Sequence, residues 1–490
     1  MKVLLVTPPF YRILGIYNRY FPLGITQLGT VLKDKGYKVA VYDADYYSDP
    51  DTIDYSRISD KFPTYLKSFK EKNQIWSEVI ENIKKWKPDV VGISAYTTFA
   101  ASAFHLAKLV KENIENCKVI MGGPHATVRA EEILEICPEV DYVVRGEAEE
   151  TMIELMNHVT GRKNDVESIS GVSFRKGKKI VSNGDRLQPK NLDNYPMLNR
   201  SLLMNKNKLS SEDMGLIMTS RGCPYRCTYC ASTKGIRYRS IGSVMEEVEA
   251  VFEKYGTRQF TFKDDSFTVD RSRVVDLCNR LIQWKVKINW ECNTRVNLVD
   301  EELLRLMKKA GCNFVKVGVE TGSARVLKMM NKGISLDQVR SASKLFRKVG
   351  LHWTGYFMMG VVGETEKDIQ KTVDFMHEIK PNLGVIAVYE AFPGTVMFEE
   401  GLKKRLYREN MSLEDFYSMA PDSYYKVDPR VQNEKITPKR FEIIKKEVNK
   451  EFHQQNMMVG NVMAMARSKI RVYYRDPKIF FDDVKKMLSY

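Results

Sequence analysis

The first 150 residues alternate between short apolar runs and longer stretches with apolar residues at helical spacing. The apolar runs are continuous and end at Pro, Gly or polar residues, as buried parallel strands do. They cover residues 2–7, 37–42, 89–94, 118–121 and 142–144. Strands that alternate with helices predict right-handed crossovers and a doubly wound parallel sheet of the α/β class. Ligands of such sheets bind beyond the carboxyl ends of the strands.

A second alternation, in which a strand is followed by an amphipathic helix, repeats from residue 214 to about residue 400. The predicted strands are residues 216–219, 259–262, 288–291, 314–319, 354–359 and 384–389. Helix signals agree with this reading, since Val244, Val248 and Val251 share one face before Gly256. Six units without a seventh and eighth predict a partial (βα)6 barrel, whose site lies at the carboxyl ends of its strands.

The remaining segments carry less chemistry. Residues 151–213 predict a linker with a β-hairpin around Lys176-Gly177. Residues 401–490 predict a helical C-terminal domain, basic and rich in methionine. Those methionines are Met457, Met458, Met463 and Met465. We expect a lid over the open side of the barrel; the alternative is an interfacial surface that contacts a membrane or admits a lipid.

Composition limits the class of protein. Hydrophobic residues make up 43% of the 490 residues, which excludes global disorder. Eight unevenly spread cysteines do not form a secreted disulfide framework. With no secretory signal and no apolar run long enough to span a bilayer, we expect a cytoplasmic monomer. The formal net charge of +15 comes from scattered residues without a nucleic-acid motif, so we expect a solvated basic surface and no specific nucleic-acid partner.

Three cysteines stand in one short loop after the first strand of the second region. Cys223, Cys227 and Cys230 have the spacing C-x3-C-x2-C. A 4Fe–4S cube ordinarily takes four thiolates, so three leave one iron open to a small molecule. An open position separates a catalytic metal site from a structural one. A zinc site would need a second cysteine pair, which the sequence lacks.

This loop, with Tyr229 before its last cysteine, resembles the signature of radical S-adenosylmethionine (SAM) enzymes. The resemblance implies that the open iron chelates SAM, and that an electron from a flavodoxin or ferredoxin yields a 5′-deoxyadenosyl radical under anaerobic conditions. It further implies SAM contacts at the strand ends: Tyr229, Asp265, Glu291, Arg295, Glu320 and Gly360. The structural alternative for Glu291 and Arg295 is an ion pair with each other.

The first region resembles the flavodoxin-like cobalamin-binding domain that precedes the barrel in many of these enzymes. The matching pieces are a Thr-Pro-Pro turn, a Gly-Gly-Pro-His segment and an Arg-Gly-Glu segment. The implied cobalamin contacts are Thr7, Pro8, Ser94, Tyr96, Gly122, Gly123, His125, Gly146 and Glu147. No Asp-x-His-x-x-Gly loop is present, so we expect no histidine on the lower face of cobalt. The alternative for His125, which has equal weight, is a loop histidine that is hydrogen-bonded to the backbone.

Together the resemblances, which include the anaerobic Mg-protoporphyrin cyclase class, imply a methyltransferase. It would methylate an unactivated carbon of a small molecule or lipid through the 5′-deoxyadenosyl radical and methylcobalamin. A radical enzyme that forms a ring or rearranges carbon, on a lipid or tetrapyrrole, is the alternative. Transfer RNA methylthiolation needs a second three-cysteine cluster, but only Cys117 and Cys137 precede Cys223. An iron–sulfur electron carrier or zinc-stabilised RNA-binding protein would need a fourth ligand.

Three further cysteines lack cluster spacing. We predict that Cys278 and Cys312 are core thiols. Cys292 lies near the inferred site, so both a core position and a role in the site stay open for it. Tyr356 and Tyr389 are predicted to serve barrel packing rather than a radical relay.

Overall fold

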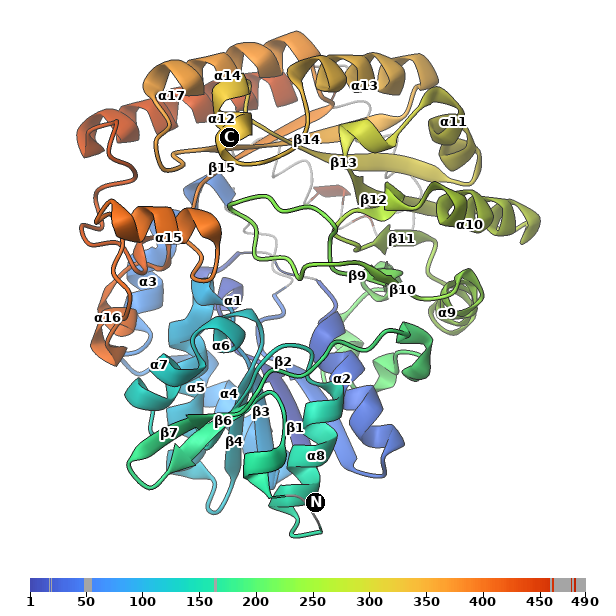
Figure 1. The fold of residues 1–490 in the computed structure, drawn as a ribbon. Helices are drawn as coiled ribbons and strands as arrows, with labels where there is room; N and C mark the ends of the chain where they lie inside the picture. Colours follow the sequence, from blue (N-terminus) through green and yellow to red (C-terminus); the bar gives the residue numbers. More distant parts are fainter. Residues whose placement is uncertain are drawn as a thin grey trace.

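The computed structural model describes residues 1–16, 18, 20–47, 55–162, 165–458, 461, 477, 480 and 481. Two units lie one above the other in Figure 1, with the N-terminal sheet below and a second sheet above it. The predicted Met463 and Met465 of the tail lie outside the described residues. Within the described part, no helix is long and apolar enough to cross a membrane.

The N-terminal unit is built on a seven-stranded sheet of order β2-β1-β3-β4-β5-β6-β7. Its first five strands are parallel and have the flavodoxin-like order that the resemblance implied. They are β1 (Lys2–Thr7), β2 (Lys38–Asp43), β3 (Val90–Ser94), β4 (Lys118–Gly122) and β5 (Tyr142–Val144). The predicted doubly wound sheet is therefore confirmed.

Helices cover both faces of this sheet, which explains its continuous apolar strands. Side chains of β1 alternate between two cores: Leu5 belongs to one cluster and Leu4 to the other. One face carries α2 (Leu23–Asp34) and α8 (Glu149–Val159), and the other carries α4 (Gln74–Trp86) and α5 (Ala100–Asn113). Shorter helices complete the unit: α1 (Tyr11–Leu14), α3 (Phe62–Lys67), α6 (Pro124–Val128) and α7 (Ala130–Ile136).

The predicted hairpin forms but does not belong to a free linker. Strands β6 (Val172–Lys176) and β7 (Lys179–Ser182) extend the N-terminal sheet antiparallel to β5. Val172 and Phe174 are buried against the core of that sheet. The hairpin thus belongs to the N-terminal sheet and makes β7 its edge strand.

The second unit contains six parallel strands in the order β15-β14-β13-β12-β11-β8, as predicted. They are β8 (Leu216–Ile217), β11 (Gln259–Phe262), β12 (Asn289–Thr294), β13 (Cys312–Glu320), β14 (His352–Met359) and β15 (Leu383–Val388). A two-stranded ladder of β9 (Ser220–Arg221) and β10 (Arg237–Tyr238) follows β8. The order places β8 and β15 at opposite edges, so the barrel is partial.

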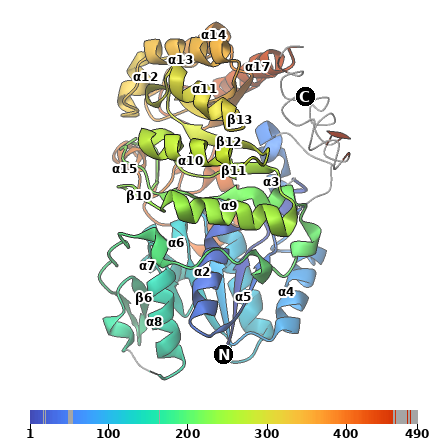
Figure 2. The same cartoon turned by 90° about the vertical axis from the view of Figure 1, so that its right-hand side faces the viewer.

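Helices cover the outer face of the partial barrel in Figure 2. They are α9 (Ile241–Tyr255), α10 (Arg271–Gln283), α11 (Glu301–Lys309), α12 (Ala324–Met329), α13 (Leu336–Val349) and α14 (Glu366–Ile379). Phe262, Trp290 and Val317 are fully buried beneath them. The alternate positions Glu291, Lys316 and Tyr356 are only partly buried or exposed, so the opposite face of the sheet is polar.

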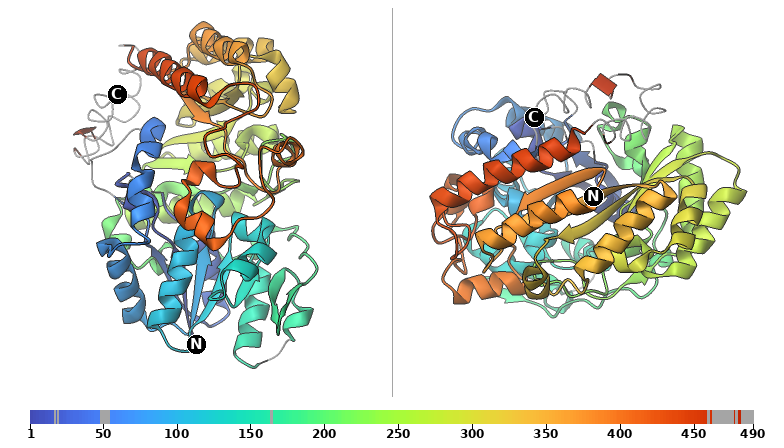
Figure 3. Two further views of the ribbon diagram at one scale, coloured as in Figure 1. Left: turned by 90° about the vertical axis from the view of Figure 1, so that its left-hand side faces the viewer. Right: turned by 90° about the horizontal axis from the view of Figure 1, so that it is seen from above.

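The C-terminal segment contacts both units. Helix α17 (Pro438–Asn456) lies beside α14 and β15 in Figure 3, and Phe452 packs on Phe357 at a centroid distance of 5.1 Å. It therefore extends the outer helical layer. Helices α15 (Val396–Lys403) and α16 (Leu413–Ser418) turn back toward the N-terminal unit, where Phe416 packs on Phe104 at 5.1 Å.

Candidate functional site

The three-cysteine loop is held in place by its own backbone. The Cys223 N–H donates to the Thr233 carbonyl at 2.9 Å, and the Cys230 N–H donates to the Cys227 carbonyl at 3.2 Å. Gly222, with φ of +83°, starts the loop where a Cβ would lie 2.1 Å from the Gly235 oxygen. A side chain at this position would therefore displace the loop.

The three thiols are free and lie within electrostatic reach of one another. Burial raises the pKa of Cys230, a hydrogen bond from Ser232 opposes this, and the thiolates of Cys227 and Cys223 raise it further. Such a donor set fits an iron–sulfur cluster, which is held by thiolates. No group of three His, Cys, Asp or Glu side chains within the described ranges is arranged to hold a single metal ion.

Arg295 places a positive charge beside this loop. Its guanidinium lies 3.6 Å from the Tyr225 ring centroid and contacts the Cys227 sulfur at 3.8 Å. A second N–H donates to the Lys332 carbonyl, and the side chain is 6% exposed. A buried guanidinium therefore contacts a sulfur atom of the cysteine loop.

Glu320 lies opposite Tyr229, on a strained backbone. Its φ is +68°, a conformation that costs a non-glycine residue about 1 kcal/mol or more. Its carboxylate accepts from Lys332 Nζ at 2.6 Å, and the same ammonium contacts the Tyr229 hydroxyl at 3.3 Å. Burial, followed by the Glu320 carboxylate, raises the pKa of Tyr229. The sequence predicted Glu320 and Tyr229 but missed Lys332, which stands in no recognisable motif.

Gly318 leaves the space that this ion pair occupies. A Cβ at Gly318 would lie 2.3 Å from Glu320 Oε1 and 2.7 Å from Lys332 Nζ. A side chain at residue 318 would therefore displace the charged ends of Glu320 and Lys332.

The carboxylates that follow β11 and lie on β12 have different neighbours. Asp264 is buried and accepts from the Thr219 N–H at 2.7 Å, which joins β8 to β11. Asp265 accepts from the Ser232 hydroxyl in the cysteine loop. Glu291 pairs with Lys316 at 2.5 Å across adjacent strands. Glu291 and Arg295 therefore have different partners, and the alternative of an ion pair between them does not hold.

Gly360 begins a turn that is fixed to the C-terminal segment. Its N–H donates to Glu364 at 2.5 Å, and a Cβ at Gly360 would lie 2.7 Å from Gln432. Burial raises the pKa of Glu364 to about 8. A role for Gly360 beside adenine stays a prediction, because its nearest side chains belong to the C-terminal segment.

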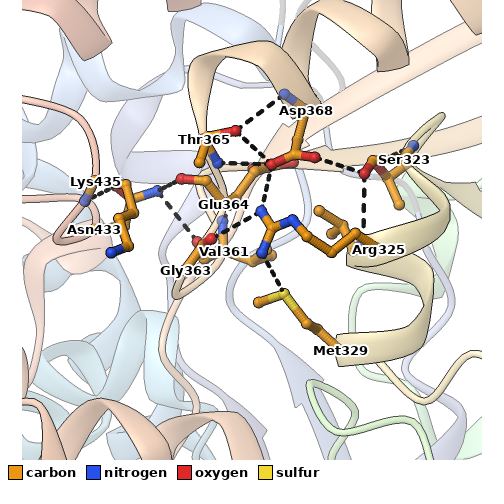
Figure 4. A network of polar contacts seen from close by, with 12 residues as sticks. Ser323, Arg325, Met329, Val361, Gly363, Glu364, Thr365, Asp368, Asn433 and Lys435 are labelled. Atoms are coloured by element: carbon orange, nitrogen blue, oxygen red, sulfur yellow. Dashed lines mark hydrogen bonds and ion pairs between the residues drawn. The ribbon is translucent and has the colours of Figure 1, made fainter.

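Figure 4 shows how the rest of this turn is held. Asp368 accepts from the Ser323 hydroxyl at 2.6 Å and from Arg325, whose guanidinium also donates to the Gly363 carbonyl at 3.0 Å. Asn433 donates to the carbonyls of Val361 and Glu364 at 3.2 Å each. The contacts join the turn after β14 to α12 and to the C-terminal segment.

A cavity of about 390 Å³ lies between the two units. Six of the residues predicted to contact cobalamin line it: Ser94, Tyr96, Gly122, Gly123, Gly146 and Glu147. The barrel contributes Gly222 and Thr233 of the cysteine loop, with Lys263 and Asp265 after β11. A Cβ at Gly146 would meet no atom within 4 Å, so this glycine borders open space. The cavity fits a bulky cofactor held by the strand ends of the N-terminal sheet.

Thr7, Pro8 and His125 are not part of the described lining of this cavity. The His125 ring packs against Phe104 and Phe416, with centroid distances of 6.2 Å and 5.9 Å. Its Nδ1 lies 3.2 Å from the Thr97 hydroxyl, and burial lowers its pKa to about 3. A contact between His125 and cobalamin stays a prediction, and the position of the ring in an aromatic core does not support it.

Ion pairs connect the two units beside the cysteine loop. Arg221, adjacent to Gly222, pairs with Glu147 at 3.0 Å and with Glu149 at 2.6 Å. Arg237 adds a second guanidinium to Glu147. Burial alone would raise the pKa of Glu147, but the two arginines lower it below its usual value. The Arg-Gly-Glu segment thus holds the cysteine loop as well as lining the cavity.

Other predicted residues are placed as follows. Cys278, Cys292 and Cys312 are buried together on the outer side of the sheet, so Cys292 joins the core thiols. Tyr389 is buried, as barrel packing predicts, whereas Tyr356 is 38% exposed on the inner face. The packing prediction for Tyr356 was therefore wrong.

Comparison with known proteins agrees with this geometry. The family model of the Radical SAM superfamily matches residues 217–376, and that of the B12 binding domain matches residues 13–156. An uncharacterized methyltransferase of Pyrococcus horikoshii is 32% identical over 415 residues, which cover 83% of this chain and 84% of that protein. The anaerobic magnesium-protoporphyrin IX monomethyl ester cyclase of Cereibacter sphaeroides is 27% identical over 66% of this chain and 55% of its own length.

The fold also matches solved structures. The radical S-adenosylmethionine methyltransferase TsrM from Kitasatospora setae, solved with cobalamin and a [4Fe-4S] cluster, has a TM-score of 0.63 at 19% identity. The match covers 84% of this chain and 76% of that one. The likeness therefore includes both units and their mutual arrangement.

Proposed function

Because this chain belongs to the radical SAM superfamily and carries a B12 binding domain, we propose that it methylates an unactivated carbon of a small molecule. The observation that carries the proposal is that residues of both units line the same cavity. A methyl donor on the strand ends of the N-terminal sheet and a radical source on the cysteine loop would face the same substrate there. The methyltransferase among the relatives supports this assignment.

When bound, the cluster and SAM would provide a 5′-deoxyadenosyl radical, and cobalamin would provide the methyl group. The residues of the chain position these groups. Cys223, Cys227 and Cys230 would hold the cluster, with Arg295 in contact with the Cys227 sulfur. Glu320, fixed by Lys332, would accept from the SAM ribose, and Asp265 would face the cavity beside it. An external flavodoxin or ferredoxin would supply the electron.

The anaerobically reconstituted protein tests this proposal. We expect close to four irons and four sulfides per chain, one bound corrinoid, and 5′-deoxyadenosine from SAM under reducing conditions. One zinc ion per chain and no SAM cleavage would contradict the assignment as a radical SAM enzyme. A cluster without bound corrinoid would contradict the proposed methylation.

A ring-forming reaction is the second candidate, favoured by the similarity to the cyclase of Cereibacter sphaeroides. The same cavity would then position a substrate radical that closes on itself. The mass of the product separates the two: methylation adds 14 Da from SAM, while closure of a ring by dehydrogenation adds no carbon.

A further inference from the structure

One cation on the cavity wall is not used by the contacts described so far. Lys263 follows β11, where its N–H donates to the Ile217 carbonyl at 2.8 Å. Its side chain is exposed and lines the cavity between the two units. Among the described residues no carboxylate lies within ion-pair distance of its ammonium, which stands 5.1 Å from the Tyr20 ring centroid.

The acidic groups of the same cavity are already engaged. Glu147 and Glu149 bind Arg221, and Asp265 accepts from Ser232. Glu247 binds Arg200 at 2.8 Å and also Arg239. Asp265 keeps its charge, because its partner Ser232 is neutral. Lys263 is therefore a cation of the described cavity lining that has no carboxylate within ion-pair distance, and its ammonium is available to an anionic ligand.

A second lysine reinforces this charge from the next strands of the barrel. Lys316 lies on the inner face of the sheet, where it pairs with Glu291 at 2.5 Å. Surrounding protein, then repulsion by Lys316, lowers the pKa of Lys263, although Glu291 opposes this. The two lysines and Glu291 thus act on one another electrostatically, and Asp265 adds a second carboxylate at the cavity wall.

Aromatic rings flank the same charges. Tyr20 is 57% exposed beside Lys263, and Tyr356 is 38% exposed within electrostatic reach of Lys316 and Glu291. Exposed rings next to a cation offer contact area for the apolar part of a ligand and a hydroxyl for its polar part.

We propose that Lys263 and Lys316, flanked by Tyr20 and Tyr356, bind an anionic group of the substrate, a carboxylate or a phosphate. The inference rests on the proposed function, since it places the substrate in the cavity between the cluster loop and the strand ends of the N-terminal sheet. Lys263 makes the direct contact, and Glu291 keeps Lys316 oriented toward it. The anion would fix the orientation of the substrate, because a charge-assisted hydrogen bond is stronger and more directional than a neutral one.

Calorimetric titration of the reconstituted holoenzyme with benzoate, phenyl phosphate and benzyl alcohol tests this inference. We expect the better anion to bind about tenfold or more tightly than the neutral alcohol. Stronger binding of phenyl phosphate assigns a phosphorylated substrate, and stronger binding of benzoate assigns a carboxylate. Equal affinity for all three probes would overturn the inference.

Variants connect the anion preference to the lysine. Lys263→Met should abolish it and Lys263→Arg should keep it, while Lys367→Met on the exposed surface of α14 should leave it unchanged. An anion preference that is retained in Lys263→Met would overturn the inference. Loss of corrinoid or weaker SAM binding in Lys263→Met, with unchanged binding of the anions, would overturn it as well. SAM cleavage measured in parallel reports on the proposed function separately, because a protein without radical chemistry can still show the anion preference.

Discussion

Arg221 and Glu147 join the cysteine loop of the barrel to the cavity wall of the N-terminal unit, with a guanidinium–carboxylate distance of 3.0 Å. Arg221 also holds Glu149, so one side chain binds two carboxylates of the other unit. Because Arg221 directly precedes Gly222 and Cys223, the position of the cysteine loop depends on this contact. The distance between the two cofactors would then be set by an ion-pair network rather than by a flexible linker.

Removing Arg221 should loosen this arrangement. Arg221→Met leaves Glu147 and Glu149 partly buried with fewer partners, which should cost roughly 1–3 kcal/mol of unfolding free energy. Urea denaturation measures this loss. Lys176→Met, which breaks the exposed pair with Glu167, serves as control and should leave the midpoint unchanged. Equal midpoints for Arg221→Met and wild type would contradict the role of this contact.

Cys227→Ala should abolish cleavage of SAM. Two thiolates hold a cluster poorly, and the Arg295 guanidinium would lose its sulfur partner. Iron content and 5′-deoxyadenosine formation measure the loss. Cys278→Ala removes a thiol from the core and should keep both, although with some loss of stability. Cleavage retained in Cys227→Ala would contradict the assignment of the loop.

Lys332→Met should weaken SAM binding without removing the cluster. Glu320 would lose the ammonium that fixes it at 2.6 Å, and its strained backbone would relax. We expect the KM for SAM to rise about five- to thirtyfold, as the loss of roughly 1–2 kcal/mol of binding free energy implies, with iron content unchanged. An unchanged KM would place Glu320 outside the SAM site.

Glu364 predicts a pH dependence of stability. Burial raises its pKa in the folded state to about 8, from an ordinary value of 4.5. The folded protein then binds more protons than the unfolded chain between these values, so this group makes stability fall as pH rises from about 4.5 to about 8. Glu364→Gln removes the titration, and its unfolding free energy should fall less than that of wild type over this interval. Parallel curves for the two proteins would contradict the prediction.

Much of the fold could be predicted from the sequence because each strand carries a local signal. The continuous apolar run of β1 and the glycine-terminated helix α9 indicate their structures within a few residues. The hairpin was also visible, but its pairing with β5 was not, since Val172 and Phe174 gain their burial only from a distant core. Pairing of this kind depends on tertiary contacts rather than on local sequence.

The candidate site was predictable where a motif carries the chemistry and unpredictable where long-range contacts do. The spacing of Cys223, Cys227 and Cys230 was sufficient to identify the loop. Lys332 could not be found, because its role arises from a folded-state contact with Glu320, twelve residues earlier in the chain. His125 shows how a motif leaves the direction of a side chain open: it follows two lining glycines, yet its ring packs in an aromatic core.

The most direct test of the account is a single turnover of the reconstituted holoenzyme with SAM labelled in its methyl carbon. The account predicts that the label reaches the bound corrinoid, and that 5′-deoxyadenosine forms in the same preparation. Label that stays on SAM while 5′-deoxyadenosine accumulates would contradict methylation, and absence of both from a cluster-loaded, corrinoid-loaded protein would contradict the central claim.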